Sequence, residues 1–474
     1  MGLASNAKWN GFSQFFKVTV QLVNLIYLAK IIPPSDYGLL ALATIVVNFG
    51  ILLRDLGTSS AVIQKENISY DLINAVFWLN IFVGFGLMVA LVSISGWFSQ
   101  FYHQPELVSV IILLSLTFPM SSCASVHLAL LERESSFKKV SFIEINSSLI
   151  SVVVAIVLAN MGYGVYSLVW QAIALNAISA IQLWICSEWR PKIIFKGWWG
   201  EIKKLLGFSV NVSLFNIVNY FSRNADTFFI GRYMNVFTLG NYNLAYRIML
   251  FPLQSLTYVT SRSLYPVLSR EQNDDNKSRD IYLNCVFFIL MISSPLMTGI
   301  AILSQPFVML VFGSQWSIAA HILTWLAPTA IIQSVISTTG SVFMARGRSS
   351  LLFKLGVLGA LLQVTSFIIG VQYDIITFSI FYLAANILNF PIVMMCVFKT
   401  IGGGFSALLR KIMPIIFATL MLIVFLMLAR AYLNIYSIYE LIGTSIIGGC
   451  IYFFVLYLTS ELVRFHIISF LKKN

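Results

Sequence analysis

The sequence has few charged side chains for its length. Asp, Glu, Lys and Arg make up 10% of its 474 residues, whereas an average soluble domain has about 25%. The chain also lacks a G-x-x-x-x-G-K-[ST] stretch, so it encodes no ATP-hydrolysing P-loop. HExxH, CxxC and GxSxG are absent too, and the histidines are scattered at His103, His127, His321 and His466. These absences argue against an enzyme and leave no candidate catalytic residue.

Cysteine is equally uninformative for chemistry. All five cysteines stand in apolar surroundings and none is paired with another at metal-ligand spacing, so we expect packing rather than a disulfide or a metal site. They are Cys123, Cys186, Cys285, Cys396 and Cys450.

Long apolar runs are what the chain has in abundance, with 58% hydrophobic residues. A soluble fold cannot bury so many apolar segments, whereas a bilayer takes about 20 residues per span. Strict polar/apolar alternation is missing, which argues against a β-barrel. We therefore predict an all-α polytopic membrane protein with about fourteen spans. They lie near 10–32, 37–53, 72–95, 107–131, 140–160, 164–186, 205–230, 238–260, 281–303, 318–345, 351–370, 375–398, 411–432 and 437–459.

Lysine and arginine are distributed unevenly along this pattern. All but six of the 30 basic residues fall at the termini, in alternate loops or at the ends of spans next to those loops, and two of the opposite loops, 96–106 and 304–317, have none. Basic residues favour the cytoplasmic side, so both termini are predicted to be cytoplasmic. The net charge of +12 is mostly this topology signal, and no soluble basic domain is present to bind nucleic acid. The six remaining basic residues are Lys17, Lys30, Arg223, Arg232, Arg247 and Arg430.

An internal repeat is visible in the sequence. LAKIIPPSDYGLLALA (28–43) aligns without a gap with IGRYMNVFTLGNYNLA (230–245), an offset of 202 residues that superposes Gly38 on Gly240. If each repeat has six spans, the two are parallel and related by a pseudo-twofold axis along the membrane normal. The same offset relates two polar stripes at helical spacing. They are Gln14, Lys17, Gln21 and Asn24 in the first span, and Asn216, Asn219, Arg223 and Asp226 in the seventh.

Charges within these stripes are the strongest functional signal. A basic side chain in the bilayer is costly unless it finds water or a partner, and Lys17 and Arg223 have polar neighbours on the same face, which predicts a water-filled cationic site. Arg223 and Asp226, three residues apart, could instead neutralise each other. Arg247 is a third candidate, with helix packing as an equal alternative. Basic groups without matching acids suit an anionic ligand, phosphate in particular.

Neutral and acidic residues complete the predicted site. Gln21, Asn24 and Asn219 suit hydrogen bonds to phosphate or to hydroxyl-rich groups such as sugars. Asp226 and Glu144 are candidates for ion coupling or for charge partners, although solvation near the cytoplasmic end is an alternative for Glu144.

Five stretches spread over most of the chain carry a further signal. They are LAKIIPPSDYGLLALA (28–43), RDLGTSSAVIQ (54–64), LLERESSFKKVSFIEI (130–145), LGNYNLAYRIMLFP (239–252) and VFGSQW (311–316). These stretches resemble, in the expected order, the Wzx-type polysaccharide flippases of the multidrug/oligosaccharidyl-lipid/polysaccharide exporter superfamily, and colanic-acid and lipopolysaccharide translocases are the most similar.

The resemblance implies a flippase of the bacterial inner membrane. Such a protein moves an undecaprenyl-pyrophosphate-linked oligosaccharide repeat unit to the outer leaflet, for O-antigen, exopolysaccharide or capsule synthesis. Two six-helix lobes form a V around a cationic cavity that works by alternating access, and the lipid tail stays in the bilayer. Coupling to a proton or sodium gradient is implied, with no cofactor. Membrane lipid, a polysaccharide polymerase and its chain-length machinery are the expected partners.

The predicted division of the chain follows from these points. An N-lobe spans 1–186, a basic cytoplasmic linker 187–204, a C-lobe 205–398, and a C-terminal helix pair with its tail 411–474. Two other functions stay open. A cation-coupled multidrug exporter of the same superfamily would favour an acidic cavity, and a membrane-embedded glycan-modifying enzyme would change its substrate chemically.

Overall fold

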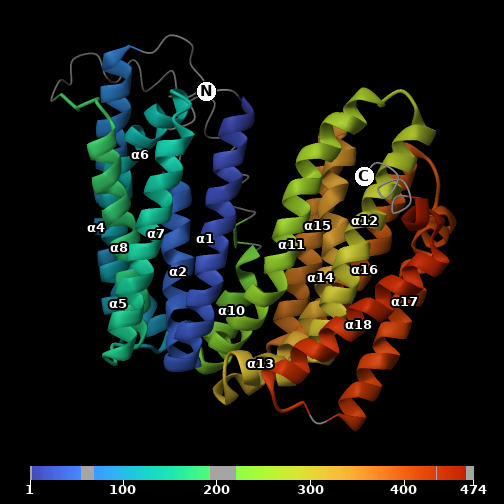
Figure 1. The fold of residues 1–474 in the computed structure, drawn as a ribbon. Helices are drawn as coiled ribbons and strands as arrows, with labels where there is room; N and C mark the ends of the chain where they lie inside the picture. Colours follow the sequence, from blue (N-terminus) through green and yellow to red (C-terminus); the bar gives the residue numbers. More distant parts are fainter. Residues whose placement is uncertain (1–2, 55–68, 193–219, 222, 434, 466–474) are drawn as a thin grey trace. The chain divides into compact units, whose positions relative to one another are not determined.

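The computed structural model describes residues 3–54, 69–192, 220–221, 223–433 and 435–465, with the side chains of all of these except 3–12, 15 and 251–262 (Figure 1). Every regular element in these ranges is a helix, as the sequence predicts. The chain forms two compact units, Met1–Gly240 and Asn241–Asn474.

The first unit is a bundle in which α7 packs between α1 and α8, α6 packs on α4 and α8, and α2 packs on α5. Its helices are α1 (Leu3–Ile31), α2 (Pro34–Arg54), α4 (Tyr70–Tyr102), α5 (Leu107–Ser115), α6 (Thr117–Arg133), α7 (Phe137–Asn160), α8 (Val165–Cys186), α10 (Ala225–Tyr233) and the first turn of α11 (Val236–Arg270).

The second unit is built around α14, which packs on α12 and α16. Helix α15 covers α16, and α17 packs on both α12 and α18, so the C-terminal helix pair shares a core with α12. Its elements after α11 are α12 (Asp275–Ile302), α13 (Ser304–Val311), the 3-10 helix η1 (Ser314–Trp316), α14 (Ser317–Ala345), α15 (Ser349–Gly370), α16 (Ile375–Ile401), α17 (Phe405–Tyr432) and α18 (Ile438–Thr459).

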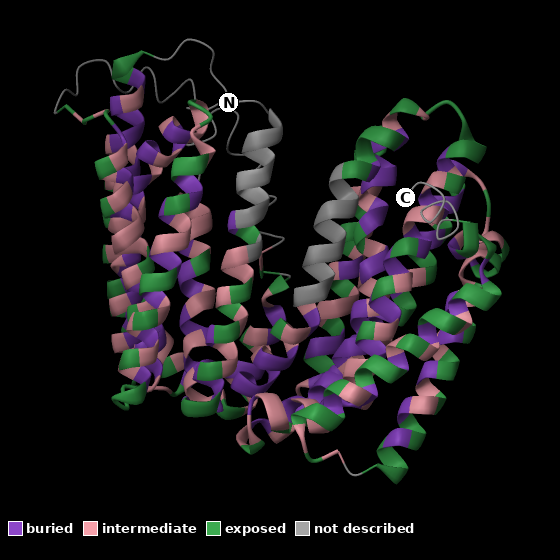
Figure 2. Cartoon of the chain, in the orientation of Figure 1, coloured by how far each residue is buried: buried purple, intermediate pink, exposed green. Residues whose placement is uncertain are grey.

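Large apolar side chains remain exposed on both units (Figure 2). Phe142, Leu361, Leu388 and Phe454, for example, lie on four different helices and are all exposed. So many exposed large apolar side chains are unusual on a soluble monomer, whereas the hydrocarbon core of a bilayer covers them without cost. The exposed apolar faces therefore agree with a membrane-spanning protein.

Eleven helices in the described residues are long and apolar enough to cross a membrane. They coincide with eleven of the fourteen predicted spans, so the exact number stays a prediction. The other three predicted spans are 10–32, 205–230 and 238–260. Span 10–32 contains several polar residues. Residues 205–219 of span 205–230 lie outside the described residues, and span 238–260 falls in α11.

Two helices extend well beyond the predicted spans. Helix α4 has 33 residues and α11 has 35, against predicted spans of 72–95 and 238–260. Polar and aromatic residues follow the apolar run in both cases, and hydropathy falls there although helical hydrogen bonding continues. In α4 the ends are set by Ser69, whose hydroxyl accepts from the Leu72 N–H, and by His103 in the left-handed conformation.

The repeated glycines meet each other at a helix crossing inside the first unit. A Cβ atom on Gly38 would lie 1.8 Å from the carbonyl oxygen of Val236, and a Cβ on Gly240 would lie 1.7 Å from that of Pro34. Pro34 and Val236 are related by the same 202-residue offset as the glycines. Each copy of the repeat thus places its glycine on the equivalent carbonyl of the other copy, as a twofold relation requires.

The first residues of the predicted linker are held against the first unit. The Tyr70 hydroxyl donates to the Arg190 carbonyl, and the Trp78 indole donates to the Lys192 carbonyl at 2.9 Å. The Lys192 N–H donates to Asn74 Oδ1 at 2.8 Å. Residues 193–204 of the linker lie outside the described residues.

A capping carboxylate gives one prediction for stability. Asp374 precedes α16 and accepts from the Thr377 N–H at 3.2 Å, and its hydrogen bonds to Thr377 lower the pKa of its carboxyl group. Replacing Asp374 with alanine is expected to destabilise the protein by about 1 kcal/mol. Thermal unfolding in detergent measures the loss, and Asp374→Asn is expected to retain most of the stability at neutral pH.

The lowered pKa fixes the sign of the pH dependence. Ionised Asp374 stabilises the fold above the pKa of the unfolded chain, and this contribution disappears as the pH falls through the folded-state pKa. The difference in stability between wild type and Asp374→Asn should therefore shrink in acid, and a difference that grew in acid would contradict the assignment.

Candidate substrate-binding site

Small side chains on α7 let its neighbours approach closely. Ser147, Ser151, Ala155 and Ala159 recur at every fourth position and are all buried. Residues four apart share one face of a helix, and small residues on such a face allow close helix packing in membranes. Helix α7 contacts α1 and α8, so the polar stripe of α1 is brought next to polar residues of both helices.

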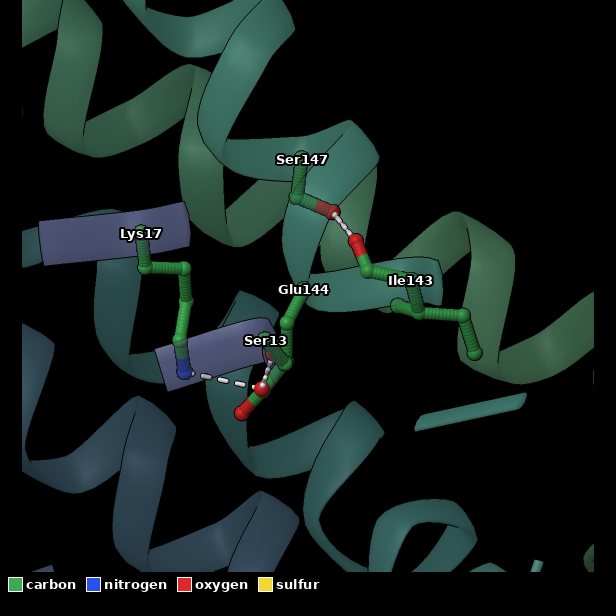
Figure 3. A network of polar contacts seen from close by, with 5 residues as sticks. All are labelled: Ser13, Lys17, Ile143, Glu144 and Ser147. Atoms are coloured by element: carbon green, nitrogen blue, oxygen red, sulfur yellow. Dashed lines mark hydrogen bonds and ion pairs between the residues drawn. The ribbon is translucent and has the colours of Figure 1, made fainter. Parts of the chain in front are cut away.

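The central contact joins Lys17 to Glu144 across 127 residues of chain (Figure 3). Lys17 Nζ lies 2.8 Å from Glu144 Oε2, and the Ser13 hydroxyl donates to the same oxygen at 2.9 Å. Ser13 is buried and stands one turn before Lys17 on α1. The structure therefore brings together one predicted cationic residue and one predicted acidic partner.

Solvent exposure decides how firmly this pair is held. The side chains of Lys17 and Glu144 are 23% and 42% exposed. An ion pair that water reaches contributes only about 0–1 kcal/mol to stability, far less than its Coulomb energy. Lys17 can consequently exchange Glu144 for another anion at little cost, and a phosphate offers more negative charge and more acceptor oxygens than the carboxylate does.

The polar stripe continues along α1 beyond Lys17. Asn24 Nδ2 donates to Gln171 Oε1 at 3.3 Å, and Tyr27 exchanges hydrogen bonds with Asn160. Asn24 is buried, and its Oδ1 has no hydrogen-bond partner among the described residues. Gln21 is exposed. The stripe thus combines an exposed amide with a buried acceptor that is available to a donor.

Arg223 and Asp226 do not lie on one continuous helix, although the sequence pattern predicts that they do. Helix α10 begins at Ala225, and Asn224 forms a turn that separates the two charged residues. Arg223 is exposed, whereas Asp226 is buried in the first turn of α10 and its Oδ1 accepts from the Thr227 N–H at 2.7 Å. A carboxylate is favourable at a helix N-terminus, so Asp226 has a structural role that does not depend on Arg223.

Arg247 and Asn219 complete the predicted set. Arg247 belongs to the second unit and is exposed on α11. Asn219 lies outside the described residues. The role predicted for each of these residues in substrate binding stays a prediction.

Sequence reasoning missed three hydrogen-bonding residues around the α1 stripe. Ser13 of α1 donates to Glu144, Gln171 of α8 accepts from Asn24, and Asn160 of α7 bonds to Tyr27, which follows the stripe on α1. Asn160 ends an apolar span and Gln171 lies inside one. A polar residue in an apolar span is the one sequence feature that could have identified them. No spacing rule links them to α1, because their pairing depends on how three helices pack.

Comparison with known proteins supplies the family. A model of the polysaccharide biosynthesis protein family matches residues 27–321, more than half of the chain. The lipopolysaccharide biosynthesis protein WzxC of Escherichia coli is 28% identical over 78% of this chain and 75% of its own length. The teichuronic acid biosynthesis protein TuaB of Bacillus subtilis is 27% identical over 87% of this chain and 85% of its own length.

Solved structures agree on the fold. The lipid II flippase MurJ matches with a TM-score of 0.72 at 14% identity, over 94% of this chain and 98% of its own. A multidrug resistance MATE family transporter of the MOP superfamily matches with a TM-score of 0.57 at 15% identity, over 81% and 95%. The two solved structures are a flippase and a transporter by name, and the match in fold confirms the expected exporter fold. The chain belongs to the polysaccharide biosynthesis protein family.

Proposed function

We propose that the chain translocates an undecaprenyl-pyrophosphate-linked oligosaccharide repeat unit across the bacterial inner membrane for surface polysaccharide synthesis. The observation that carries the proposal is the Lys17–Glu144 pair, a partly exposed cation that an apolar helix bundle presents beside a carboxylate. Family membership supports the polysaccharide pathway. A pyrophosphate is the group in such a substrate that a lysine recognises.

Each residue of the site has a task in this scheme. Lys17 leaves Glu144 and binds a phosphate oxygen, while Ser13 continues to donate to the carboxylate. Gln21 and the Oδ1 atom of Asn24 hydrogen-bond to phosphate or sugar hydroxyl groups. When the phosphate departs, Glu144 takes Lys17 back, so the cation is never left without a partner in the membrane.

Further cations and an ion gradient belong to the same proposal. Arg223 and Arg247 are additional candidates for pyrophosphate contact, and Arg suits phosphate because its guanidinium can bind two oxygens at once. A proton or sodium gradient drives the cycle, with Asp226 as the coupling group, while Glu144 serves as the charge partner of Lys17. Both chain termini face the cytoplasm.

Glu144→Gln tests the exchange of partners. Glutamine keeps the size of the side chain and an oxygen acceptor for Ser13 and Lys17, but it removes the charge. We expect a strain that carries this variant in place of the wild type to keep surface polysaccharide within about threefold, since the pair contributes only about 0–1 kcal/mol. Polysaccharide is measured on whole cells, with membrane levels of the protein checked by immunoblot.

Three results would count against the proposal. Normal surface polysaccharide in a strain that lacks the chain would contradict its proposed role in polysaccharide synthesis. Loss of export in Glu144→Gln equal to that in Lys17→Ala, at normal protein levels, would instead assign the pair to holding α1 against α7. Drug sensitivity that changes while polysaccharide stays normal would favour the multidrug exporter.

A further inference from the structure

A cluster of aromatic rings surrounds Arg232 at one end of the first unit. The guanidinium carbon of Arg232 lies 5.1 Å from the ring centroid of Phe101 and 5.7 Å from that of Tyr233. Phe101 in turn stacks on Trp97 with 5.3 Å between centroids and contacts Phe228 at 5.7 Å. These five residues, from α4 and α10, are called the Arg232 platform.

Neighbouring residues explain why the platform stands where it does. A Cβ atom on Gly231 would lie 2.4 Å from a methyl group of Leu42 and 3.3 Å from the ring of Tyr102, so the missing side chain at Gly231 lets α10 pack closely against α2 and α4. Ile230 and Gly231 are buried, and Arg232 and Tyr233 follow them at the end of α10. Trp97 and Tyr233 are 61% and 63% exposed, and the platform therefore presents two aromatic surfaces.

The charge of Arg232 is not neutralised locally. No carboxylate among the described residues forms an ion pair with it. Stacking on aromatic rings uses the face of a guanidinium and leaves its N–H edge for an anion. Arg232 also takes the place of Lys30 when the two copies of the repeat are aligned, so both copies end the corresponding helix with a cation.

We infer that the Arg232 platform is an exit site that binds the lipid-linked oligosaccharide after translocation, and this rests on the proposed function. The loop distribution of lysine and arginine predicts that this end of the unit faces away from the cytoplasm. Arg232 binds a phosphate of the substrate, and Trp97 and Tyr233 stack on its sugars. Ordinary phospholipids offer the phosphate but no sugar ring, so exposed aromatic faces beside the arginine favour the glycolipid.

Photo-crosslinking tests this inference in cells. Benzoyl-phenylalanine replaces Tyr233 in the full-length chain, and the cells are fed a tritiated sugar that labels the lipid-linked oligosaccharide. Phe82, which is 53% exposed on α4, receives the same crosslinker as the matched control. We expect a labelled adduct at position 233 and none at position 82. Adding Arg232→Ala should lower its yield about tenfold, because the charged hydrogen bond to the phosphate is lost, and Arg232→Lys should lower it less.

Opposite results would overturn the inference. Adducts at position 233 that contain only phospholipid, or labelled adducts of equal yield at positions 233 and 82, would make the platform part of an aromatic belt at the membrane surface. Surface polysaccharide measured on the same cells distinguishes a failure of the exit site from a failure of the proposed function. If export depends on the chain but no labelled adduct forms, only the exit site is contradicted. If export does not depend on the chain, the proposed function itself is contradicted.

Discussion

Lys17→Ala is expected to abolish surface polysaccharide while the protein still folds and inserts. A hydrogen bond from a charged donor contributes about 1.5–3 kcal/mol, and about 1.4 kcal/mol corresponds to a tenfold change in binding. Loss of Lys17 should therefore weaken substrate binding by tenfold or more. Lys17→Arg keeps the positive charge and should restore part of the export. Whole-cell polysaccharide and membrane levels of each variant give the measurement.

A matched control separates this effect from a general loss of positive charge. Lys139 is exposed on α7, the helix that carries Glu144. Lys139→Ala removes the same type of residue near the site and should leave export unchanged. Normal export in Lys17→Ala would show that Lys17 does no more than neutralise Glu144, and the cationic site would lose its best-described residue.

Gly38→Ala and Gly240→Ala should each destabilise the protein strongly and by similar amounts. In both variants the new methyl group would lie less than 2 Å from a backbone carbonyl oxygen. Inserting atoms into a packed interior costs about 1–3 kcal/mol, and the cost should reach or exceed that range here because a backbone cannot rotate aside as a side chain can. Thermal unfolding in detergent and protein levels in the membrane report the loss.

Gly86→Ala is the control for the helix crossing. Gly86 lies within α4, and a Cβ atom there would meet nothing within 4 Å. Alanine favours a helix over glycine by about 1 kcal/mol, so this variant should be as stable as wild type or more stable. If Gly38→Ala behaved like Gly86→Ala, the close crossing would be wrong, and with it the structural support for the repeat.

Local patterns in the sequence predicted the helices and the repeated glycines well. Apolar runs located eleven spans that the structure also contains, because the cost of exposing backbone in a bilayer leaves the helix as the natural solution. The 202-residue offset predicted that Gly38 and Gly240 are equivalent, and the structure places them in reciprocal contact. Both inferences depend on short stretches of sequence alone.

Contacts between distant residues were beyond the same reasoning. Lys17 and Glu144 were each identified as charges inside spans, but their pairing depends on how α1 packs against α7. The turn at Asn224 was missed because Arg223 and Asp226 were assumed to share one continuous helix. A single polar residue can end a helix, or it can occupy a polar position on a continuous helix. Residue spacing alone does not distinguish these two cases.

The most direct test of the central proposal follows the substrate across the membrane. Inner-membrane vesicles of known orientation are loaded with tritiated lipid-linked oligosaccharide, and a sugar-oxidising enzyme added on the receiving side reports the translocated fraction with time. Vesicles with the wild-type chain or Glu144→Gln should expose the sugar progressively, whereas vesicles with Lys17→Ala should expose it at the rate of vesicles without the chain. Equal rates for wild-type, Lys17→Ala and empty vesicles would contradict translocation by this chain.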